Sequence, residues 1–588
     1  MRIIIKKEIT MKKTKIICTI GPSCESPELV KKLIEAGMDI ARLNFSHGSH
    51  MEHSRRITVL RQIAAEMGKT LGIMLDTKGP EIRVGVFKDG KVILREEEKV
   101  ILTTEDVVGD SNLIPVSYNG LPQALKEGNT VLLADGAIKL KVIETKEKEI
   151  SCLVVNGGIL SNRKGVNIPG ISLDLPFLSE KDIEDINFGI EQGVDFIAAS
   201  FVRRPEDALM IRRMLESKNA NIDIIAKIEN AEGVQKINDI IKVVDGVMIA
   251  RGDLGVEIPC EEVPLIQKKI IAKCNQVGKP VITATQMLES MIDNPRPTRA
   301  EASDIANAII DGSDAIMLSG ETASGKYPVE AVQFMASIAR RVEEALDCVR
   351  CSQGSASASY TVTDAIAHAT CTIAADLKAS AIITATKSGF TSRMVSKYRP
   401  KAPIIAACPD ENICRKLALV WGVQPIVGCT KNSTDEIIKE AIERSLEVGL
   451  IKNGDLVVLT AGIPYKTNLI KVSSIGEVLA RGTGIGSSVV TGKIRICRSP
   501  QEAKKKIQPG DILVVRSTDQ DYIPFIKKAG AIIAEEGGLT SHTAITSLNL
   551  KIPALVGVDG AQKILDDNSD ATIDTMRGLI YKGIITVR

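Results

Sequence analysis

Short apolar runs alternate with amphipathic stretches through the first half of the chain. Eight of these runs are expected to be buried strands: Lys15–Ile20, Asp39–Phe45, Leu71–Asp76, Asp195–Phe201, Asp223–Ile228, Gly246–Ala250, Pro280–Ala284 and Asp314–Leu318. Segments with helical spacing of apolar residues, such as SPELVKKLIEAG, lie between most of them. Near-continuous apolar strands are typical of a parallel sheet covered by helices. Eight strand–helix units make a closed (β/α)8 TIM barrel, so the pattern predicts an α/β barrel over residues 11–82 and 178–350.

This alternation of strands and helices is interrupted once, between the third and fourth predicted strands. Residues 83–177 carry short alternating runs such as KVIL and IKLKVIE, punctuated by KDG, ADG and NGG. Such spacing is typical of hairpins, so we expect an all-β insertion, folded as a small β-barrel. Because it leaves the barrel after a strand, it rises from the catalytic face, where we expect it to act as a lid.

Strands and helices alternate again beyond Gly354. The order runs from the helical DAIAHATCTIAADL to the strand LVVLTAG, which predicts an open α/β domain over residues 355–472. The glycine-rich RGTGIGSS (Arg481–Ser488) is expected to be a linker, because its glycine spacing does not fit a dinucleotide fingerprint. A final mixed α/β domain of the swivelling type is expected over residues 487–588.

Composition and charge narrow the possible partners. Lys and Arg (75) nearly balance Asp and Glu (73), and a net charge of +2 does not favour nucleic acid or an anionic membrane as partner. No apolar run reaches the roughly 20 residues of a membrane span, and MRIIIKKEIT has no cleavage site of a signal peptide. A cytoplasmic location is therefore expected, with Met11 as an alternative start. The 12 cysteines are expected to be reduced and buried, and the pair Cys348 and Cys351 is not placed for redox chemistry.

Polar residues gather at the C-terminal ends of the predicted barrel strands, which meet at one mouth. They are Arg42, Asn44, Ser46, His47, Asp76, Thr77, Lys78, Glu81, Arg83, Lys227, Glu229, Arg251, Gly252, Asp253, Thr285, Ser319, Gly320 and Glu321. The carboxylates of Glu229 and Asp253, on successive strands, suit a hard divalent cation such as Mg²⁺. Arginines and a lysine beside such a metal describe a phosphoryl-transfer site, where positioning and charge neutralisation do most of the catalysis.

Two plainer interpretations apply to some of these residues. Loops are solvated, so charged residues commonly follow strands; but Lys227 and Glu229 are embedded in the apolar IDIIAKIEN, where each charge needs a partner or a metal. His47, His50 and His53 are spaced by three, yet helical rotation carries successive positions apart. We therefore expect no metal triplet, and a surface position for His50 and His53.

Several segments resemble the signature segments of the pyruvate kinase family. They are TKIICTIGPS, ARLNFSHG, LDTKGPEIR, KGVNIPG, IAKIEN, MIARGDLGVEIP, ITATQMLESM, NPRPTRAEASDIANAIIDGSDAIMLSGETA and GKYPVEAV, spread over most of residues 14–340. The resemblance continues more loosely to about Lys471. It implies a glycolytic enzyme that transfers a phosphoryl group from phosphoenolpyruvate to ADP, giving pyruvate and ATP. It also implies allosteric regulation and a homotetramer.

The resemblance further implies roles for the matched residues. Glu229 and Asp253 would hold Mg²⁺ or Mn²⁺. The implied K⁺ ligands are Asn44, Ser46, Asp76 and Thr77. The implied contacts of substrate and nucleotide are Arg42, Asn44, His47, Arg83, Lys227, Asp253 and the amides near Ala250, Arg251 and Gly252. Thr285 would lie in the path of proton delivery near C3, and Asp135 would be a lid residue. In potassium-independent relatives a lysine stands at the position of Glu81, so this chain is expected to need K⁺.

The segment TATKSGFTS lies between a predicted strand and a predicted helix. Amides and hydroxyls at such a junction can cradle a phosphate, whereas Ser388 alone would make an ordinary helix cap. The resemblance favours an allosteric site for a phosphorylated effector, a sugar phosphate or a nucleotide. Its expected residues are Thr384, Thr386, Lys387, Ser388, Gly389 and Thr391.

The segment EEGGLTSHTAITSLNLKIPALVGV resembles the phosphohistidine domain of other phosphoenolpyruvate-utilising enzymes. One alternative is therefore a phosphotransferase that works through phospho-His542. Those enzymes place a barrel of their own after this domain, and this chain has none there. We expect an accessory domain in which His542 is not required for turnover. A non-catalytic metabolite-sensing scaffold is the other alternative; it would tolerate loss of Lys227 or Asp253, and both are present.

Overall fold

The computed structural model describes residues 12–171, 173, 175–346, 361–428, 434–462 and 467–585. The Met11 start and the Cys348/Cys351 pair lie outside these residues. The chain divides into two units, residues 1–368 with 386–427 and residues 369–385 with 428–588, and each is described by itself.

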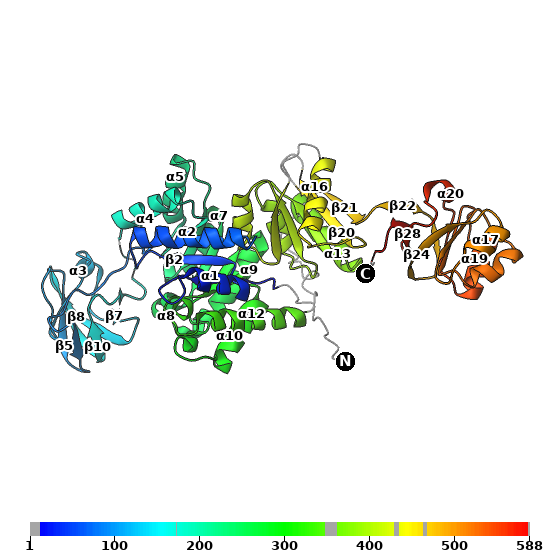
Figure 1. Ribbon diagram of the computed structural model, residues 1–588. Coiled ribbons are helices and arrows are strands. Elements are labelled where there is room, and N and C mark those ends of the chain that lie inside the picture. Colours follow the sequence, from blue (N-terminus) through cyan, green and yellow to red (C-terminus); the bar gives the residue numbers. More distant parts are fainter. Residues whose placement is uncertain are drawn as a thin grey trace. The chain divides into compact units, whose positions relative to one another are not determined.

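The first unit contains the predicted barrel. Its strands are β1 (Lys15–Thr19), β2 (Ile40–Asn44), β3 (Gly72–Asp76), β12 (Phe196–Ala199), β13 (Asp223–Ile228), β14 (Gly246–Ala250), β15 (Val281–Ala284) and β16 (Ala315–Leu318), parallel and closed in that order. The surrounding helices include α1 (Pro27–Ala36), α2 (His50–Glu66), α4 (Glu180–Glu191), α5 (Pro205–Ser217), α7 (Ile237–Val243), α9 (Val263–Val277), α10 (Arg299–Asp311) and α12 (Pro328–Ala345) (Figure 1). The sequence-based prediction of a TIM barrel is confirmed.

Alternate residues of each strand belong to two different apolar layers. On β12, Ile197 and Ala199 pack outward among the helices, whereas Phe196 and Ala198 pack inside the barrel. This period of two is the geometry of any strand, and it explains why the runs are apolar at every position.

Four aspartates lie at the N-terminal ends of the barrel strands, the end of the barrel called the lower rim below. Asp39, Asp195, Asp245 and Asp314 stand directly before β2, β12, β14 and β16. Each carboxylate accepts a hydrogen bond from a main-chain amide of the adjacent strand, at Ile16, Ile73, Ile224 and Val281. Each also has a cationic partner. Lys12 pairs with Asp39, Arg61 and Arg415 pair with Asp195, Arg212 pairs with Asp245, and Arg399 pairs with Asp314. These paired charges, of which Asp195 and Asp314 are buried, fix how neighbouring strands line up at this end.

The insertion after β3 is all-β apart from the short α3 (Leu121–Ala124), as predicted. Its strands are β4 (Lys91–Leu94), β5 (Lys99–Thr103), β6 (Leu113–Pro115), β7 (Thr130–Leu133), β8 (Ile138–Thr145), β9 (Glu149–Asn156), β10 (Gly158–Ser161) and β11 (Val166–Asn167). They form a six-stranded sheet, β11-β7-β8-β9-β5-β6, and a β10-β4 ribbon rather than one closed barrel. The insertion has an apolar core of its own and returns to the barrel just before α4.

Residues 386–427 lie against the lower rim of the barrel. They form α14 (Phe390–Ser396), β18 (Ile404–Cys408), α15 (Glu411–Leu417) and β19 (Val423–Val427). Leu419 joins the apolar layer inside the barrel, and Lys416 pairs with Asp223 at the start of β13. This segment therefore closes the end of the barrel opposite the predicted catalytic residues.

The second unit starts within α13 (Val362–Asp376), at Ala369. Strand β17 (Ala381–Ala385) follows this helix and pairs in parallel with β20 (Leu456–Gly462). Helix α16 (Thr434–Glu447) precedes β20 along the chain, and β21 (Thr467–Ser474) pairs with β20 in antiparallel fashion. The alternation of strands and helices predicted for this region is thus present.

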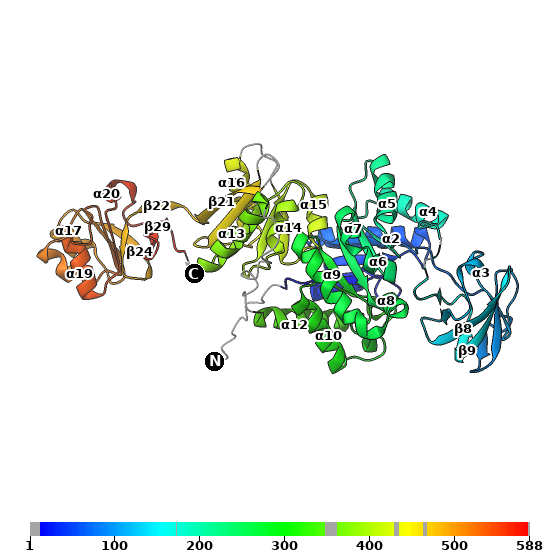
Figure 2. The same cartoon turned by 180° about the vertical axis from the view of Figure 1, so that it is seen from behind.

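The C-terminal region is an eight-stranded sheet in the order β22-β29-β28-β24-β25-β26-β27-β23. Its strands are β22 (Val478–Arg481), β23 (Thr483–Ile485), β24 (Val489–Ile496), β25 (Ile512–Val515), β26 (Ala531–Ala534), β27 (Ala554–Val556), β28 (Asp570–Asp574) and β29 (Leu579–Lys582). Helices α17 (Pro500–Lys506), α18 (Ile523–Ile526) and α19 (His542–Leu550) share one apolar cluster with the sheet, and α20 (Ala561–Ile564) belongs to a second. Figure 2 shows α17, α19 and α20 around this sheet. The predicted mixed α/β region is confirmed.

The linker prediction for Arg481–Ser488 is wrong. Strand β22 pairs with β29, and β23 pairs with β27, so both belong to the C-terminal sheet. A Cβ atom on Gly484 would lie 1.7 Å from the Thr575 carbonyl oxygen, and one on Gly482 would lie 2.5 Å from the Val558 side chain. The glycines are there because backbones approach closely, not because the segment is flexible.

Two predictions from composition can be compared with the described residues. Their cysteines are free, and only Cys260 is exposed. None of the helices in the described parts of the chain is both long and apolar enough to cross a bilayer.

Candidate active site

Lys227 is the centre of the site at the C-terminal ends of the barrel strands. It is only 8% exposed, and its Nζ lies 3.0 Å from Asp76 Oδ1, 3.0 Å from Glu229 Oε1 and 2.7 Å from Ser200 Oγ. Burial lowers the pKa of Lys227, but Asp76 and Glu229 outweigh this effect and raise the pKa above its ordinary value. The ammonium group is therefore a permanent positive charge in a site that largely excludes water.

Glu229, directly after β13, and Asp253, on α8 (Arg251–Glu257), are close neighbours. Burial raises the pKa of Glu229 to about 7, with Lys227 opposing the shift and Asp253 adding to it. Burial also raises the pKa of Asp253, and Glu81 and Asp135 add to that rise. A buried carboxylate and a half-buried one held close together need a cation or a proton.

No group of three or more His, Cys, Asp or Glu side chains is arranged as a metal cage among the described residues. A pair of carboxylates nevertheless fits Mg²⁺, which commonly binds through one or two carboxylates with water and substrate phosphate completing its shell. The donor atoms here are hard oxygens, as Mg²⁺ requires.

Arg42 adds a second buried cation on β2. Its Nε donates to Asp76 Oδ2 at 2.6 Å, and its Nη1 donates to Thr19 Oγ1 at 2.9 Å. Burial favours the neutral form of Asp76, but Arg42 and Lys227 prevail and lower its pKa. Asp76 therefore stays ionised and orients both cations.

Thr285 follows β15 in a left-handed conformation, with φ of 66°. Its hydroxyl accepts a hydrogen bond from the Gly252 amide at 2.8 Å and donates to the Ala284 carbonyl at 2.6 Å. Arg251, one residue before Gly252, donates to the Thr285 carbonyl and pairs with Asp304. A β-branched residue with positive φ is strained, and such strain is often found at functional sites.

Sequence reasoning missed Ser200 and Phe201. The Ser200 hydroxyl accepts from Lys227 and lies 3.2 Å from Asp76 Oδ1, and the Phe201 amide donates to Glu229 Oε2 at 2.6 Å with Phe201 at φ of 54°. Both residues lay inside the apolar run expected to be a strand, whereas β12 ends at Ala199. The polar Ser200 at the end of that run was the available signal.

The loop between β2 and α2 carries Asn44, Ser46 and His47. The Ser46 amide donates to Asn44 Oδ1, and the His47 carbonyl contacts Nε2 of His53 at 2.9 Å. The surface position expected for His53 is wrong: the side chain is 1% exposed and stacks on Phe45, with ring centroids 4.0 Å apart. His50 is partly exposed and contacts Asp185, so its predicted surface position is met only in part.

Several predicted residues lie on the side of the insertion. Arg83 pairs with Glu81 at 2.6 Å. Asp135 and Gly136 are the central residues of the turn between β7 and β8; both have positive φ, as in a type I′ turn, and the Ala137 amide donates to the Ala134 carbonyl. The charge of Asp135 raises the pKa of Asp253, so Asp135 lies close to the barrel site.

Thr77 is buried, and its hydroxyl donates to the Ala198 carbonyl at 3.4 Å. At the end of β16, Glu321 is buried and accepts the amides of Ser319 and Leu288, so we assign it a structural role.

The predicted effector segment precedes α14. Thr386 and Thr391 are buried, Lys387 and Ser388 are exposed, and Gly389 is the N-cap residue with φ of 79°. The alternative interpretation of Ser388 as the helix cap is wrong, because Gly389 occupies that position and no side chain caps the helix. Thr384 belongs to β17 in the second unit.

His542 is the first residue of α19, with Ser541 as N-cap. Its Nδ1 lies 2.9 Å from the Thr518 hydroxyl, which leaves Nε2 as the other ring nitrogen. The predicted place of His542 at a helix N-terminus is confirmed.

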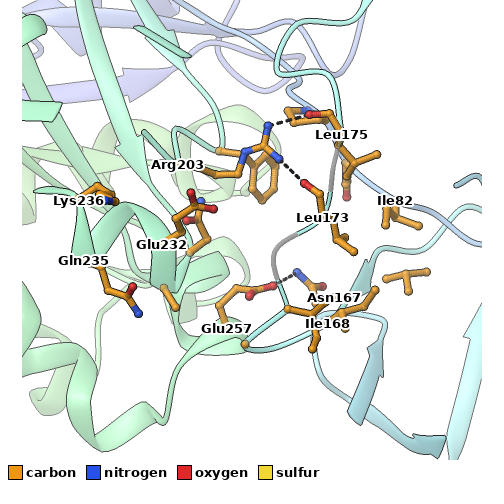
Figure 3. A pocket seen from close by; sticks show the side chains of 18 residues that line it. Ile82, Asn167, Ile168, Leu173, Leu175, Arg203, Glu232, Gln235, Lys236 and Glu257 are labelled. Carbon is orange, nitrogen blue, oxygen red and sulfur yellow. Dashed lines mark hydrogen bonds between the residues drawn. The ribbon is translucent and has the colours of Figure 1, made fainter. Parts of the chain in front are cut away.

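A cavity of about 420 Å³ lies between the insertion and the barrel (Figure 3). Its lining includes Ile168 and Leu173 from the insertion side and Phe201, Arg203 and Lys236 from the barrel side. It was not anticipated from the sequence.

A buried, charged lysine held by acidic side chains at the mouth of a TIM barrel, beside carboxylates that suit a divalent cation, fits an enzyme of the phosphoryl-transfer class. Family models described as "Pyruvate kinase, barrel domain" and "Pyruvate kinase, alpha/beta domain" match residues 11–332 and 364–473. A model described as "PEP-utilising enzyme, mobile domain" matches residues 507–578.

Whole-chain relatives agree with the family models. Pyruvate kinases of Bacillus licheniformis and Geobacillus stearothermophilus are 53% and 52% identical, each over 98% of this chain and 100% of the relative. The crystal structure of a pyruvate kinase from Cryptosporidium parvum superposes with a TM-score of 0.75 at 42% identity, covering 79% of this chain and 96% of that chain. The chain therefore belongs to the pyruvate kinase family, and its activity is the phosphoryl transfer that defines this family of glycolytic enzymes.

Proposed function

We propose that the barrel transfers a phosphoryl group from phosphoenolpyruvate to ADP, with Lys227 as the main catalytic cation. The observation that carries this proposal is the placement of Lys227, whose ammonium group is buried between Asp76 and Glu229. A fixed positive charge in a dry site stabilises the charge that develops on a transferring phosphoryl group, and it needs no reorganisation during the reaction.

Glu229 and Asp253 are proposed to hold Mg²⁺ or Mn²⁺. The bound cation would supply charge neutralisation to the phosphate and carboxylate of the substrate. Lys227 and Arg42 then face the phosphoryl group, and the main-chain amides near Ala250, Arg251 and Gly252 receive the substrate carboxylate. Because the Gly252 amide now donates to Thr285, the substrate carboxylate would compete with that hydroxyl.

The reaction proceeds in two steps. The bond between phosphorus and the enol oxygen breaks while a β-phosphate oxygen of ADP forms the new bond, so the electron pair stays on the enolate oxygen beside Lys227. Carbon C3 of the enolate then takes a proton through Thr285 and nearby water, giving pyruvate. The ketone is far more stable than the enol, which drives the transfer to ADP.

A monovalent cation is proposed at Asn44, Ser46, Asp76 and Thr77. The carboxylates of Asp76, Glu81, Glu229, Asp253 and Asp135 outnumber the cationic groups of Arg42, Arg83 and Lys227 around the site. Phosphoenolpyruvate and ADP add further negative charge, so K⁺ offsets repulsion that the protein alone leaves. Asn44, His47 and Arg83 are proposed to contact the nucleotide, with Asp135 closing over it from the lid.

Regulation and assembly are proposed from the family resemblance. The segment with Thr384, Thr386, Lys387, Ser388, Gly389 and Thr391 would bind a phosphorylated effector, and its amides and hydroxyls suit that ligand. Titration of activity against phosphoenolpyruvate with a panel of phosphorylated metabolites tests this. A homotetramer, measurable by light scattering, and a cytoplasmic location complete the proposal.

The C-terminal region is proposed to be an accessory domain. The position of His542 at a helix N-terminus supports a second candidate function, a phosphotransferase working through phospho-His542. The barrel already contains the residues for direct transfer to ADP, so we favour the accessory role.

Substitution of Lys227 tests the main proposal. We expect Lys227→Met to lower kcat by about 10²–10³-fold or more, because one preorganised charge is lost. The measurement is coupled pyruvate formation at saturating Mg²⁺ and K⁺. Lys15→Met is the matched control: Lys15 is also buried on a barrel strand but donates to the Val423 carbonyl at the lower rim, so kcat should stay near normal. Normal turnover by folded Lys227→Met would rule out the assignment.

A further inference from the structure

A four-residue loop after β12, Ser200 to Arg203, links two parts of the molecule. Its first half contacts the catalytic groups. Ser200 Oγ accepts from Lys227 at 2.7 Å and donates to the Thr77 carbonyl at 2.6 Å, and the Phe201 amide donates to Glu229 at 2.6 Å. A shift of this loop would therefore move the partners of both Lys227 and Glu229.

The second half of the loop holds the segment by which the insertion returns to the barrel. Arg203 Nη1 donates to the Leu173 carbonyl at 2.9 Å, and Nη2 donates to the Leu175 carbonyl at 2.8 Å (Figure 3). The Asp207 carboxylate accepts the Arg203 amide at 2.9 Å and lies 3.9 Å from its Nε. The side chain is 13% exposed, so the two carbonyls are bound in a partly dry setting.

The surroundings of Arg203 are loosely filled. The cavity of about 420 Å³ separates apolar residues of the insertion, such as Ile82 and Ile168, from Asn230 and Lys236 of the barrel. Asn167 of β11 donates to Glu257 of α8 across the same gap at 3.3 Å (Figure 3). Protein interiors are otherwise close-packed, so a few polar contacts rather than a packed interface hold the insertion here. Such an arrangement suits a hinge.

We propose that Arg203 is a positioning residue for phosphoryl transfer: it couples the return segment of the lid to the loop that orients Glu229 and Lys227. Closure of the lid and the orientation of the metal-binding carboxylate are then set together. Guanidinium geometry matters, because its fixed fork reaches both carbonyls at once, whereas an ammonium group is a point charge. The inference rests on the proposed roles of Glu229 and of the insertion as a lid.

The alternative is that Arg203 only stabilises the fold. A stabilising residue would change the thermal midpoint without a specific change in nucleotide or metal dependence. The neighbouring Arg204 offers a matched control, because its side chain is 46% exposed and its ion-pair partner is Glu232 at 3.6 Å.

The experiment compares Arg203→Met, Arg203→Lys and Arg204→Met in the full-length enzyme. We expect Arg203→Met to lower kcat/KM for ADP by about 10- to 100-fold, the cost of a misplacement of about 1 Å. The Mg²⁺ concentration for half-maximal activity should rise several-fold, and Arg203→Lys should fall between this variant and the wild type. Arg204→Met should match the wild type in each measurement.

Hydrogen exchange supplies the readout that a purely stabilising role would not move. Amides of Ile171, Leu173, Leu175 and Phe201 should exchange faster in Arg203→Met, while the lid strands β8 and β9 keep their protection. Unchanged kcat/KM and Mg²⁺ dependence in the folded variant would overturn the proposal, as would a loss of protection spread evenly over the molecule. If Arg203→Met does not fold, Arg203→Lys carries the test, and wild-type kinetics in that variant would count against the coupling.

Failure of this inference can be separated from failure of the proposed function. Glu229→Gln tests the metal site itself, and unchanged Mg²⁺ dependence there would contradict the proposed function. A strong effect of Glu229→Gln together with no effect of Arg203→Met would remove only the role of Arg203.

Discussion

Individual side chains of the site act mainly through charge. Lys227 and Glu229 could be named from the sequence because charged residues inside an apolar run demand partners. Ser200 and Phe201 could not be named in the same way, because they act through a hydroxyl and a main-chain amide. Any residue supplies a main-chain amide, so the pattern of side chains does not reveal one that binds a carboxylate.

We propose that Glu81 sets the requirement of the site for a monovalent cation. It pairs with Arg83 and adds negative charge close to Asp253, so we expect activity to require K⁺. Activity measured against KCl, in a background of tetramethylammonium chloride, should be low without K⁺ in the wild type. Glu81→Lys should relieve the requirement, because an ammonium group replaces the ion, whereas Glu81→Gln removes charge without replacing the ion and should relieve it less. Full wild-type activity in tetramethylammonium alone would contradict this prediction.

At the scale of the element, α2 shows a signal that was present in the sequence but not used. His53, Ile57, Leu60 and Ala64 recur at helical spacing, and all are buried. That spacing places His53 on the core face of the helix. The barrel strands were predictable to within about two residues because their apolar runs match their lengths. Strands β22 and β23 were not, because glycines required by close backbone approach resemble those of a linker.

The first turn of α2 should make the protein sensitive to acid. Burial lowers the pKa of His53, and its Nδ1 is buried without a partner. Below the unfolded-state pKa of about 6.5, the unfolded chain takes up a proton that folded His53 does not. Stability from this residue is therefore fully present above pH 6.5 and is lost as the pH falls toward the folded-state pKa, at up to about 1.4 kcal/mol for each pH unit.

His53→Phe isolates this effect, because phenylalanine keeps the stack on Phe45 and cannot take a proton. Thermal midpoints at pH 7.5, 6.5 and 5.5 are the measurement, and the other four histidines are common to both proteins. The wild type should lose stability relative to the variant as the pH falls. Parallel pH curves would show that His53 does not titrate differently in the folded state.

At the scale of the whole molecule, the strand pairing shows that a deletion of the C-terminal domain should start before β22 and not at Ser487. Strands β22 and β23 pair with β29 and β27, so a cut at Ser487 would leave both without partners. Ile475 is hydrogen bonded to Gly454 and Asp455, which makes it the last residue tied to the preceding strands.

A chain ending at Ile475 should retain substantial pyruvate kinase activity, because the proposed catalytic residues all lie in the barrel and its insertion. A chain ending at Gly486 is the control, and we expect it to aggregate more because two unpaired strands are exposed. His542→Ala in the full chain should leave turnover unchanged. Incubation with labelled phosphoenolpyruvate in the absence of ADP, followed by an acid-labile phosphohistidine assay, is the decisive measurement. Stoichiometric label on His542 that discharges at the turnover rate would make this domain part of the catalyst.

The aspartates before β2, β12, β14 and β16 lie far from the mouth of the barrel, so the residues that align the strands are different from those proposed to react. Strand alignment is set by carboxylates at the lower rim, whereas the proposed reacting groups stand at the opposite ends of the strands. Replacements around the mouth can therefore alter substrate preference without changing how the barrel closes. Directed evolution toward other phosphorylated acids should draw its beneficial mutations from the upper ends of the strands and leave the lower rim untouched.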